Sequence, residues 1–286
     1  MPHCCKLFSL LNFTALLLGF HQSQAEIAES FDMTAVSGCD IGSLGARAGA
    51  DSRGWMSTWQ TVAGSARYSS DDLSIDSLSS AGGSIQLRGQ RKAKSIGRAV
   101  VMRQIDATYS GDVYGQFRFN SGSLHKDSVI GVLLSAPSEE PPTPKNAIFA
   151  ICPKRWGSNY GMIGAGHKVA KVDIGAACEA FQNYLVLWKL ENLPTPGKRK
   201  KIQLKMWVLS EAQASHFNAS NFAEDSLLEA TSGSGTKQVC QFAFVTIPNS
   251  KRTIARGMVL SLFNFSTPQL YFDEINVSDK NFKVYP

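Results

Sequence analysis

Short segments rich in β-branched and aromatic residues recur along almost the whole chain, and this pattern limits the fold more than any other feature of the sequence. Examples are SIQLRG, RAVVMRQI, DVYGQFRF, YLVLWKL and LYFDEINV, in which apolar and polar residues partly alternate. Residues that favour turns, namely Gly, Ser, Pro and Asn, separate these segments. Many strands with little helix predict an all-β fold, and long two-faced strands favour a two-sheet antiparallel sandwich of jelly-roll type.

The connections between these segments are also readable. The stretch LENLPTPGKRKK joins two strong strand segments, 184–190 and 202–209, and predicts a hairpin. The proline-rich stretch 135–146 predicts a rigid, exposed loop. The segment SNFAEDSLLEA, residues 220–230, is the one short helix that we expect, because Ser220 or Asn221 can cap it and acidic residues fall in its first turns.

The first 25 residues have the order of regions that is typical of a secretory signal peptide. Lys6 precedes the apolar run LFSLLNFTALLLGF, and Ser23 and Ala25 are the small residues before a cleavage site. The run is too short to span a bilayer comfortably, although an uncleaved anchor is the alternative. We therefore predict a signal peptide at residues 1–25 and a single β-sandwich domain at residues 26–286. This domain would be secreted, periplasmic or at the cell surface.

The charge pattern does not favour a nucleic-acid partner. The formal net charge is +6, and two basic stretches, 88–98 and 197–201, carry much of it. No nucleic-acid-binding motif accompanies them, so we interpret both as solvated loops. Anionic polysaccharide and lipid headgroups remain open as partners.

The order of motifs in the mature chain resembles that of the secreted bacterial proteins with a laminin-G-like, concanavalin A-like jelly roll. An aromatic–acid pair, a Gly-rich stretch and two tryptophans open it, as ESFDMTAVSGCDIGSLGARAGADSRGWMSTWQ. The segments GRAVVMRQIDATYSGDVYGQFRF and YLVLWKLENLPTPGKRKKIQLKMWVLS follow, and YFDEINVS closes it. The chain departs from the pattern after KMWVLS, where an Asn-Pro is usual, and in its larger number of cysteines. The resemblance implies the concanavalin A-like fold and secretion, but no particular activity.

The residues give little support to catalysis. A retaining glycosidase needs two carboxylates about 5–5.5 Å apart, and an inverting glycosidase needs two that are about 6.5–9.5 Å apart. Asp273 and Glu274 are consecutive, so on a regular strand they would point to opposite faces. The chain has no Gly-x-Ser-x-Gly nucleophile motif. We therefore expect no catalytic residue. A polysaccharide-degrading enzyme, a lyase or a glycosidase, is the alternative, and His167 with Tyr160 and Arg155 would be its lyase groups.

The stretch PKRWGSNYG offers the best candidate for ligand binding. Trp156 and Tyr160, with Arg155 beside them, fall in a polar segment with glycines that we interpret as a loop. By contrast, Trp55 and Trp59 are expected to fill the core or to close one end of the sandwich. We therefore predict a secreted, non-catalytic carbohydrate-binding or cell-surface structural protein, whose partner is a polysaccharide or a cell-surface glycan.

A structural calcium ion is the one cofactor that we consider. Related jelly-roll carbohydrate modules often hold calcium where the first and last strands meet. By this resemblance Asp32 and Asp273 would be the ligands, and Asp40 or Asp51 with backbone carbonyls would complete the six to eight oxygens that calcium needs. A carboxylate that is hydrogen-bonded to loop amides is the alternative for Asp273.

The cysteines give a testable prediction about redox state. Cys39, Cys152, Cys178 and Cys240 remain after signal cleavage, and their spacing matches no zinc site. Export to an oxidising compartment should produce at least one disulfide among them, which would stabilise the fold by about 2–4 kcal/mol. Thiol counting under denaturing conditions checks this, and four free thiols in the exported protein would contradict it.

Overall fold

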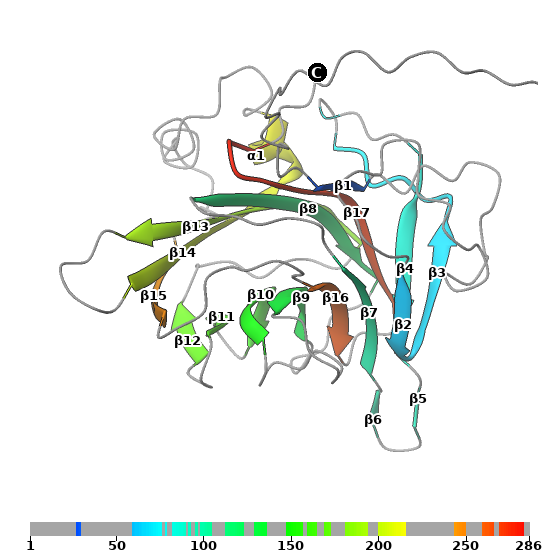
Figure 1. Ribbon diagram of the computed structural model, residues 1–286. Helices are drawn as coiled ribbons and strands as arrows, with labels where there is room; N and C mark the ends of the chain where they lie inside the picture. Colours follow the sequence, from blue (N-terminus) through cyan, green and yellow to red (C-terminus); the bar gives the residue numbers. More distant parts are fainter. Residues whose placement is uncertain are drawn as a thin grey trace, which may run out of the picture.

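The computed structural model describes residues 27–29, 59–75, 78, 82–89, 91–92, 95–96, 98–104, 112–122, 129–135, 147–156, 159–164, 169–172, 181–193, 200–215, 243–249, 259–265 and 269–282. These residues form two antiparallel β-sheets that lie one over the other, with one short helix outside them (Figure 1). The expected all-β sandwich of jelly-roll type is therefore confirmed. No helix among the described residues is long and apolar enough to cross a membrane.

The larger sheet has eight strands and carries most of the described side chains. Its order is β15 (Ala243–Asn249), β14 (Lys200–Ser210), β13 (Asn183–Leu193), β8 (Val113–Ser121), β17 (Leu270–Ser278), β4 (Ser84–Arg88) and β3 (Ser65–Ser69), and β1 (Ile27–Glu29) also pairs with β17. The predicted hairpin is present as β13 and β14, which pair from Tyr184–Ser210 to Leu193–Lys201.

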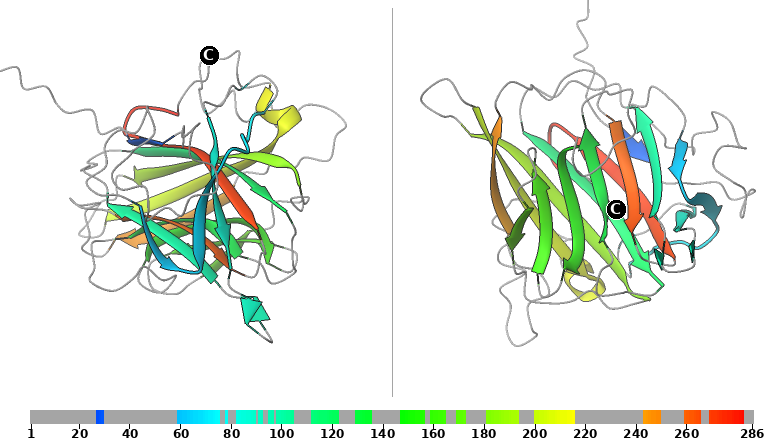
Figure 2. Two further views of the ribbon diagram at one scale, coloured as in Figure 1. Left: turned by 90° about the vertical axis from the view of Figure 1, so that its right-hand side faces the viewer. Right: turned by 90° about the horizontal axis from the view of Figure 1, so that it is seen from below.

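The second sheet has seven strands and lies beneath the first in Figure 1. Its order is β12 (Val169–Val172), β11 (Asn159–Gly164), β10 (Ala147–Trp156), β9 (Val129–Ser135), β16 (Val259–Phe265), β7 (Arg98–Gln104) and β2 (Gln60–Ala63). A small hairpin, β5 (Arg91–Lys92) with β6 (Ser95–Ile96), projects away from both sheets (Figures 1 and 2). This hairpin falls within the first basic stretch, which we had interpreted as a loop.

Aromatic side chains fill the space between the sheets. Phe117 and Phe119 alternate along β8 with polar residues, so they share its inner face. Phe117 packs against Phe272 of β17 with ring centroids 5.6 Å apart, and Phe119 stacks on Tyr184 of β13 at 5.3 Å. Trp59 is only 4% exposed, which confirms its expected place in the core, whereas Trp55 lies outside the described residues.

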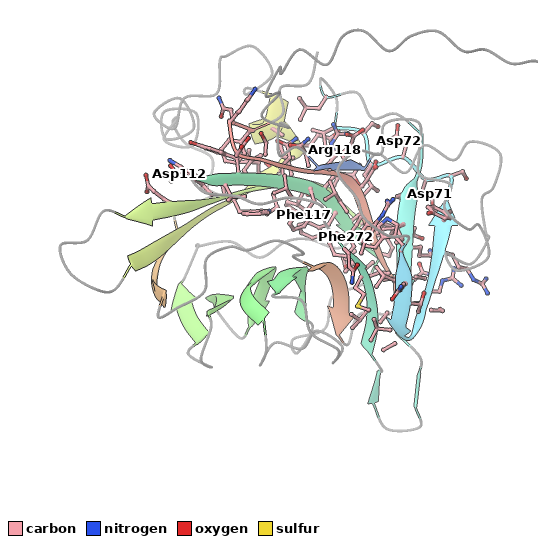
Figure 3. The ribbon with its side chains drawn as sticks, in the orientation of Figure 1. Asp71, Asp72, Asp112, Phe117, Arg118 and Phe272 are labelled. Atoms are coloured by element: carbon pink, nitrogen blue, oxygen red, sulfur yellow. The ribbon has the colours of Figure 1, made fainter. Side chains whose placement is uncertain are left out.

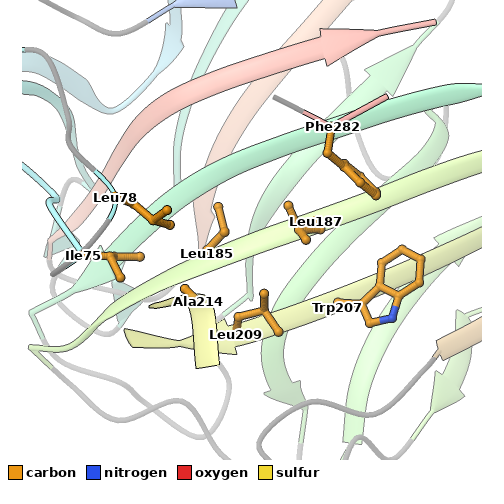
Figure 4. Close-up of a cluster of buried hydrophobic side chains, with 8 residues drawn as sticks. All are labelled: Ile75, Leu78, Leu185, Leu187, Trp207, Leu209, Ala214 and Phe282. Carbon is orange, nitrogen blue, oxygen red and sulfur yellow. The ribbon is translucent and has the colours of Figure 1, made fainter. Parts of the chain in front are cut away.

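The outer face of the eight-stranded sheet is also covered by protein over part of its area. A second apolar cluster lies there, and it includes side chains of β13, of β14 and of the helix α1 (Glu211–Ser215), which packs on both strands (Figure 4). Its members are Ile75, Leu78, Leu185, Leu187, Trp207, Leu209, Ala214 and Phe282. The helix predicted at residues 220–230 lies outside the described residues, and α1 was not predicted.

A buried arginine and a buried aspartate hold the covering segment, residues 69–75, on this outer face. Arg118 of β8 and Asp273 of β17 are cross-strand partners, and both are fully buried. The Arg118 guanidinium donates to the Leu73 carbonyl at 3.1 Å, and the Leu73 amide donates to Asp273 Oδ2 at 3.4 Å. We call this arrangement the Leu73 clamp. The two side chains thus hydrogen-bond to both backbone polar groups of Leu73, the carbonyl and the amide, as a neighbouring strand would.

A β-bulge beside the clamp breaks the regular alternation of β17. The pairing with β8 shifts by one residue between Asp273 and Asn276, and Glu274 adopts a left-handed backbone conformation with φ of 47°. The Glu274 amide donates to Asp273 Oδ1 at 2.7 Å, so both carboxylate oxygens of Asp273 accept a backbone hydrogen bond. The strand is therefore not regular at Asp273 and Glu274, because the extra residue interrupts the pleat.

The close approach of β8 to β13 gives a prediction about packing. Gly115 lies opposite Trp188, and a Cβ atom added to Gly115 would overlap the buried indole ring. Gly115→Ala should lower the free energy of unfolding by about 3 kcal/mol or more, measured by urea denaturation. The control is Gly122→Ala, whose Cβ would meet its nearest neighbours at 3.4–3.6 Å. Equal stability of the two variants would contradict this packing.

The clamp gives a prediction about Asp273. Asp273→Asn replaces one of the two oxygens that accept backbone hydrogen bonds with an amide group that cannot accept. Leaving a buried backbone donor unsatisfied should cost about 1–3 kcal/mol, seen as a lower melting temperature. Asp279→Asn, on an exposed residue just after β17, is the control.

Adding a chelator distinguishes the two roles of Asp273, in the Leu73 clamp and in the predicted calcium site. Loss of stability in the wild-type protein upon chelation would reveal a metal, whereas the clamp alone predicts no response. An unchanged melting temperature in Asp273→Asn would contradict both roles.

Candidate functional site

A row of polar side chains crosses the outer face of the eight-stranded sheet at one end of the covered area. Tyr271 of β17, Asn120 of β8 and Asn183 of β13 are successive cross-strand partners in this row. Gln86 of β4 and Arg67 of β3 continue the row on the other side of Tyr271. Because partners directly opposite each other share a face of the sheet, the row forms a continuous polar strip.

Three residues of the strip, Tyr271, Asn120 and Asn183, form the floor of a pocket with a volume of about 750 Å³. The described residues that line it are Asp71, Asp72, Leu73, Asn120, Phe181, Gln182, Asn183, Ser210, Glu211, Ala212 and Tyr271. They come from the 69–75 segment, from the four neighbouring strands β14, β13, β8 and β17, from the turn before β13 and from the start of α1. The pocket therefore depends on how the covering segments are held against the sheet.

Hydrogen bonds fix the floor of the pocket. Asn120 Nδ2 donates to Asn183 Oδ1 at 2.7 Å, and Asn183 Nδ2 donates to the backbone carbonyl of Ser74 at 2.8 Å. The Gln86 side-chain amide donates to the Tyr271 hydroxyl. These bonds orient the two amides and the phenol before any ligand arrives, which lowers the entropic cost of binding.

The 69–75 segment presents two carboxylates at the pocket. Ser69 Oγ donates to Asp71 Oδ2 at 2.8 Å, and the Asp71 amide donates back to Ser69 Oγ at 3.2 Å, which closes a tight turn. Asp71 and Asp72 are both exposed in this turn, and the Leu73 clamp fixes the next residue. Glu211, at the start of α1, adds a third exposed carboxylate from a different element. Figure 3 labels Asp71 and Asp72 near Arg118.

Phe181 stands at the pocket in an unusual state for a large apolar residue. Its side chain is 76% exposed, and it is the one exposed large hydrophobic side chain in the described part of the chain. Its φ of 63° is left-handed, a conformation that costs a bulky residue about 1–2 kcal/mol. Its amide donates to the Ser121 carbonyl at 2.8 Å, which holds the turn. Neither the exposure nor the backbone conformation of Phe181 favours folding, and such residues cluster at functional sites.

The residues predicted for ligand binding lie in the other sheet. Arg155 and Trp156 end β10, Tyr160 is the second residue of β11, and Arg155 pairs directly with Tyr160. The expectation of a loop over PKRWGSNYG was therefore wrong for the described residues, because 153–156 and 159–161 lie on the paired strands β10 and β11. The side chains of Arg155, Trp156 and Tyr160 lie outside the described part, as does His167, so their roles stay predictions.

The calcium prediction also stays untested. Asp273 belongs to the Leu73 clamp, and Asp32, the other predicted ligand, lies outside the described residues. Among the residues that the structure describes, no three His, Cys, Asp or Glu side chains are grouped so that they could hold a metal ion. Of the four cysteines, Cys152 lies on β10, and the other three lie outside the described ranges.

Sequence reasoning did not find the pocket. Its described residues come from five separated stretches, and none of these has the spacing of a known motif. Two local signals were present: the paired acids in YSSDDL and the aromatic and amide residues in FQNY. Neither signal identifies a site without the strand register that places Asn120, Asn183 and Tyr271 side by side.

Comparison with known proteins gives distant structural likenesses. No family model matches the chain, and no curated protein matches it. Alginate lyase Aly36B is 7% identical, with a TM-score of 0.44 over 91% of this chain and 99% of that one. The PL-14 alginate lyase from Aplysia kurodai is 8% identical, with a TM-score of 0.42 over 71% and 87%.

The carbohydrate recognition domain of Emp47p is 10% identical, with a TM-score of 0.40 over 77% of this chain and 87% of that one. At these identities and TM-scores, the likenesses give no argument about activity or ligand. Membership of the laminin-G-like, concanavalin A-like family accordingly stays a prediction.

Proposed function

We propose that this chain binds a carbohydrate in the pocket on the outer face of its eight-stranded sheet and does not convert it. The observation that carries the proposal is Phe181, an aromatic ring held exposed beside a floor of amides and carboxylates. The flat apolar face of a sugar ring can pack on an aromatic ring, and its hydroxyl groups can both donate and accept hydrogen bonds. The pocket offers both kinds of contact together.

The oriented polar groups support the proposal. Asn120 and Asn183 each carry a donor and an acceptor, the Tyr271 hydroxyl can do both, and the carboxylates of Asp71 and Asp72 accept. Such mixed groups match the hydroxyl groups of a sugar better than an apolar ligand. A location outside the cytoplasm, as residues 1–25 predict, would expose the pocket to extracellular glycans.

A glycosidase is the second candidate, and one observation favours it. The fold brings Asp71 and Asp72 into the same pocket as Glu211, although Glu211 is distant in the sequence. Carboxylates from two elements that face one cavity are the groups that glycoside hydrolysis requires. Measuring reducing ends together with binding therefore separates the two candidates.

A substitution at Phe181 tests the proposal without destabilising the fold. Phe181→Gly removes the ring and relieves the left-handed backbone, so its melting temperature should equal or exceed that of the wild type. Its affinity for an oligosaccharide should fall by about tenfold or more, equivalent to about 1.4 kcal/mol, measured by calorimetry. Phe181→Tyr keeps the ring and should retain affinity.

The wild-type protein is first titrated with neutral, amino and uronic-acid oligosaccharides. Because the affinity expected of such sites is weak, on the order of micromolar to millimolar, calorimetry or NMR is preferred to a wash-based assay. Binding that survives Phe181→Gly unchanged would contradict the pocket as the site. Release of reducing ends would favour the glycosidase, and absence of any binding would leave a structural role.

A further inference from the structure

We propose that the pocket selects saccharides that carry positive charge, namely glycans with free amino groups, over uronic-acid polymers. This inference rests on the proposed function and names its ligand class. Three of the described lining residues, Asp71, Asp72 and Glu211, are carboxylates, and all three are exposed. None of the described lining residues is Lys, Arg or His. A cationic ligand therefore meets attraction from each of these side chains.

One basic residue of the polar row, Arg67, is not among the described residues that line the pocket. It lies two strands away from Tyr271 in the register, and neighbouring strands are about 4.8 Å apart, so the backbones of the two residues are about 10 Å apart. The charged side chains among the described lining residues are therefore all carboxylates.

The charge of the carboxylates that line the pocket is opposite in sign to the net charge of the whole chain. The formal net charge is +6, so the general surface attracts polyanions. A pocket lined by carboxylates on a basic protein repels those same polyanions at close range, because pairwise interactions at about 4 Å outweigh the screened field of distant charges. This difference separates specific binding in the pocket from general adhesion to acidic polymers.

The arrangement of the carboxylates indicates a ligand with separated charges. Asp71 and Asp72 come from the 69–75 segment, and Glu211 comes from α1. They do not converge as the ligands of one metal ion would, since no metal-binding group of three occurs among the described residues. Positive groups at intervals along a saccharide, as in a glucosamine oligomer, fit carboxylates spread around a cavity. Phe181, which also lines the pocket, would supply an apolar packing surface.

A matched pair of ligands isolates the charge. A glucosamine hexasaccharide and its N-acetylated counterpart share one sugar skeleton, and only the first is cationic when its amino groups are protonated. Calorimetry at low salt should give tighter binding for the glucosamine oligomer, and this preference should shrink as salt rises. An oligogalacturonate of equal length should bind weakest of the three.

Charge-neutralising variants locate the effect in the pocket. Asp72→Asn and Glu211→Gln keep the side-chain shapes, and each should weaken glucosamine binding by about fivefold more than it weakens N-acetylglucosamine binding. Asp279→Asn, an exposed residue outside the pocket, removes the same charge elsewhere and should leave both affinities unchanged.

The outcomes separate this inference from the proposed function. Equal binding of the two glucosamine ligands, or tighter binding of the galacturonate, would overturn the charge preference while carbohydrate binding stands. An equal effect of Asp279→Asn and Asp72→Asn would overturn its location in the pocket. Absence of binding to all three saccharides would overturn both.

Discussion

The rest of the outer face depends on the Leu73 clamp, in which buried Arg118 and Asp273 hydrogen-bond to the backbone of Leu73. Taking two charges out of water is costly, and mutual attraction offsets that cost only when further hydrogen bonds satisfy both groups. Here the Leu73 carbonyl accepts a hydrogen bond from Arg118, and the Leu73 amide donates one to Asp273. On one side of Leu73 the chain turns to present Asp71 and Asp72, and on the other it delivers Ile75 to the apolar cluster. One buried pair thus fixes both a polar pocket and the apolar cover next to it.

Backbone strain in the described residues is concentrated near this same region. Among the described residues that are not glycine, Phe181 and Glu274 are the two with positive φ. Glu274 forms the bulge whose amide completes the bonding of Asp273, and Phe181 forms the turn that places an aromatic ring at the pocket. Both conformations are unfavourable for these residue types and persist because neighbouring hydrogen bonds determine them. The fold therefore uses local strain to orient groups, while the regular strands supply stability.

The alternation of apolar and polar residues predicted the strands well, because the burial of one face of a strand depends on the local sequence pattern. The segments YLVLWKL and IQLKMWVL became β13 and β14, and LYFDEINV became β17. The pocket could not be predicted in this way, because it depends on register between strands that are distant in the sequence. Tyr271 lies beside Asn120 only because β17 pairs with β8, and no local signal encodes that pairing. The bulge at Glu274 was missed for the same reason, and the extension of β10 to Trp156 because Gly and polar residues indicated a loop.

The position of the last two strands has a consequence for the order of folding. β16 lies between β9 and β7 in one sheet, and β17 lies between β8 and β4 in the other. Each sheet therefore lacks an interior strand until residues 259–278 have been synthesised. A nascent chain holds its earlier strands without their central partners, with unpaired edges and exposed aromatic side chains. Long-range pairing of this kind folds slowly and is open to aggregation while incomplete. Neither sheet can therefore complete its strand pairing before residues 259–278 have left the ribosome.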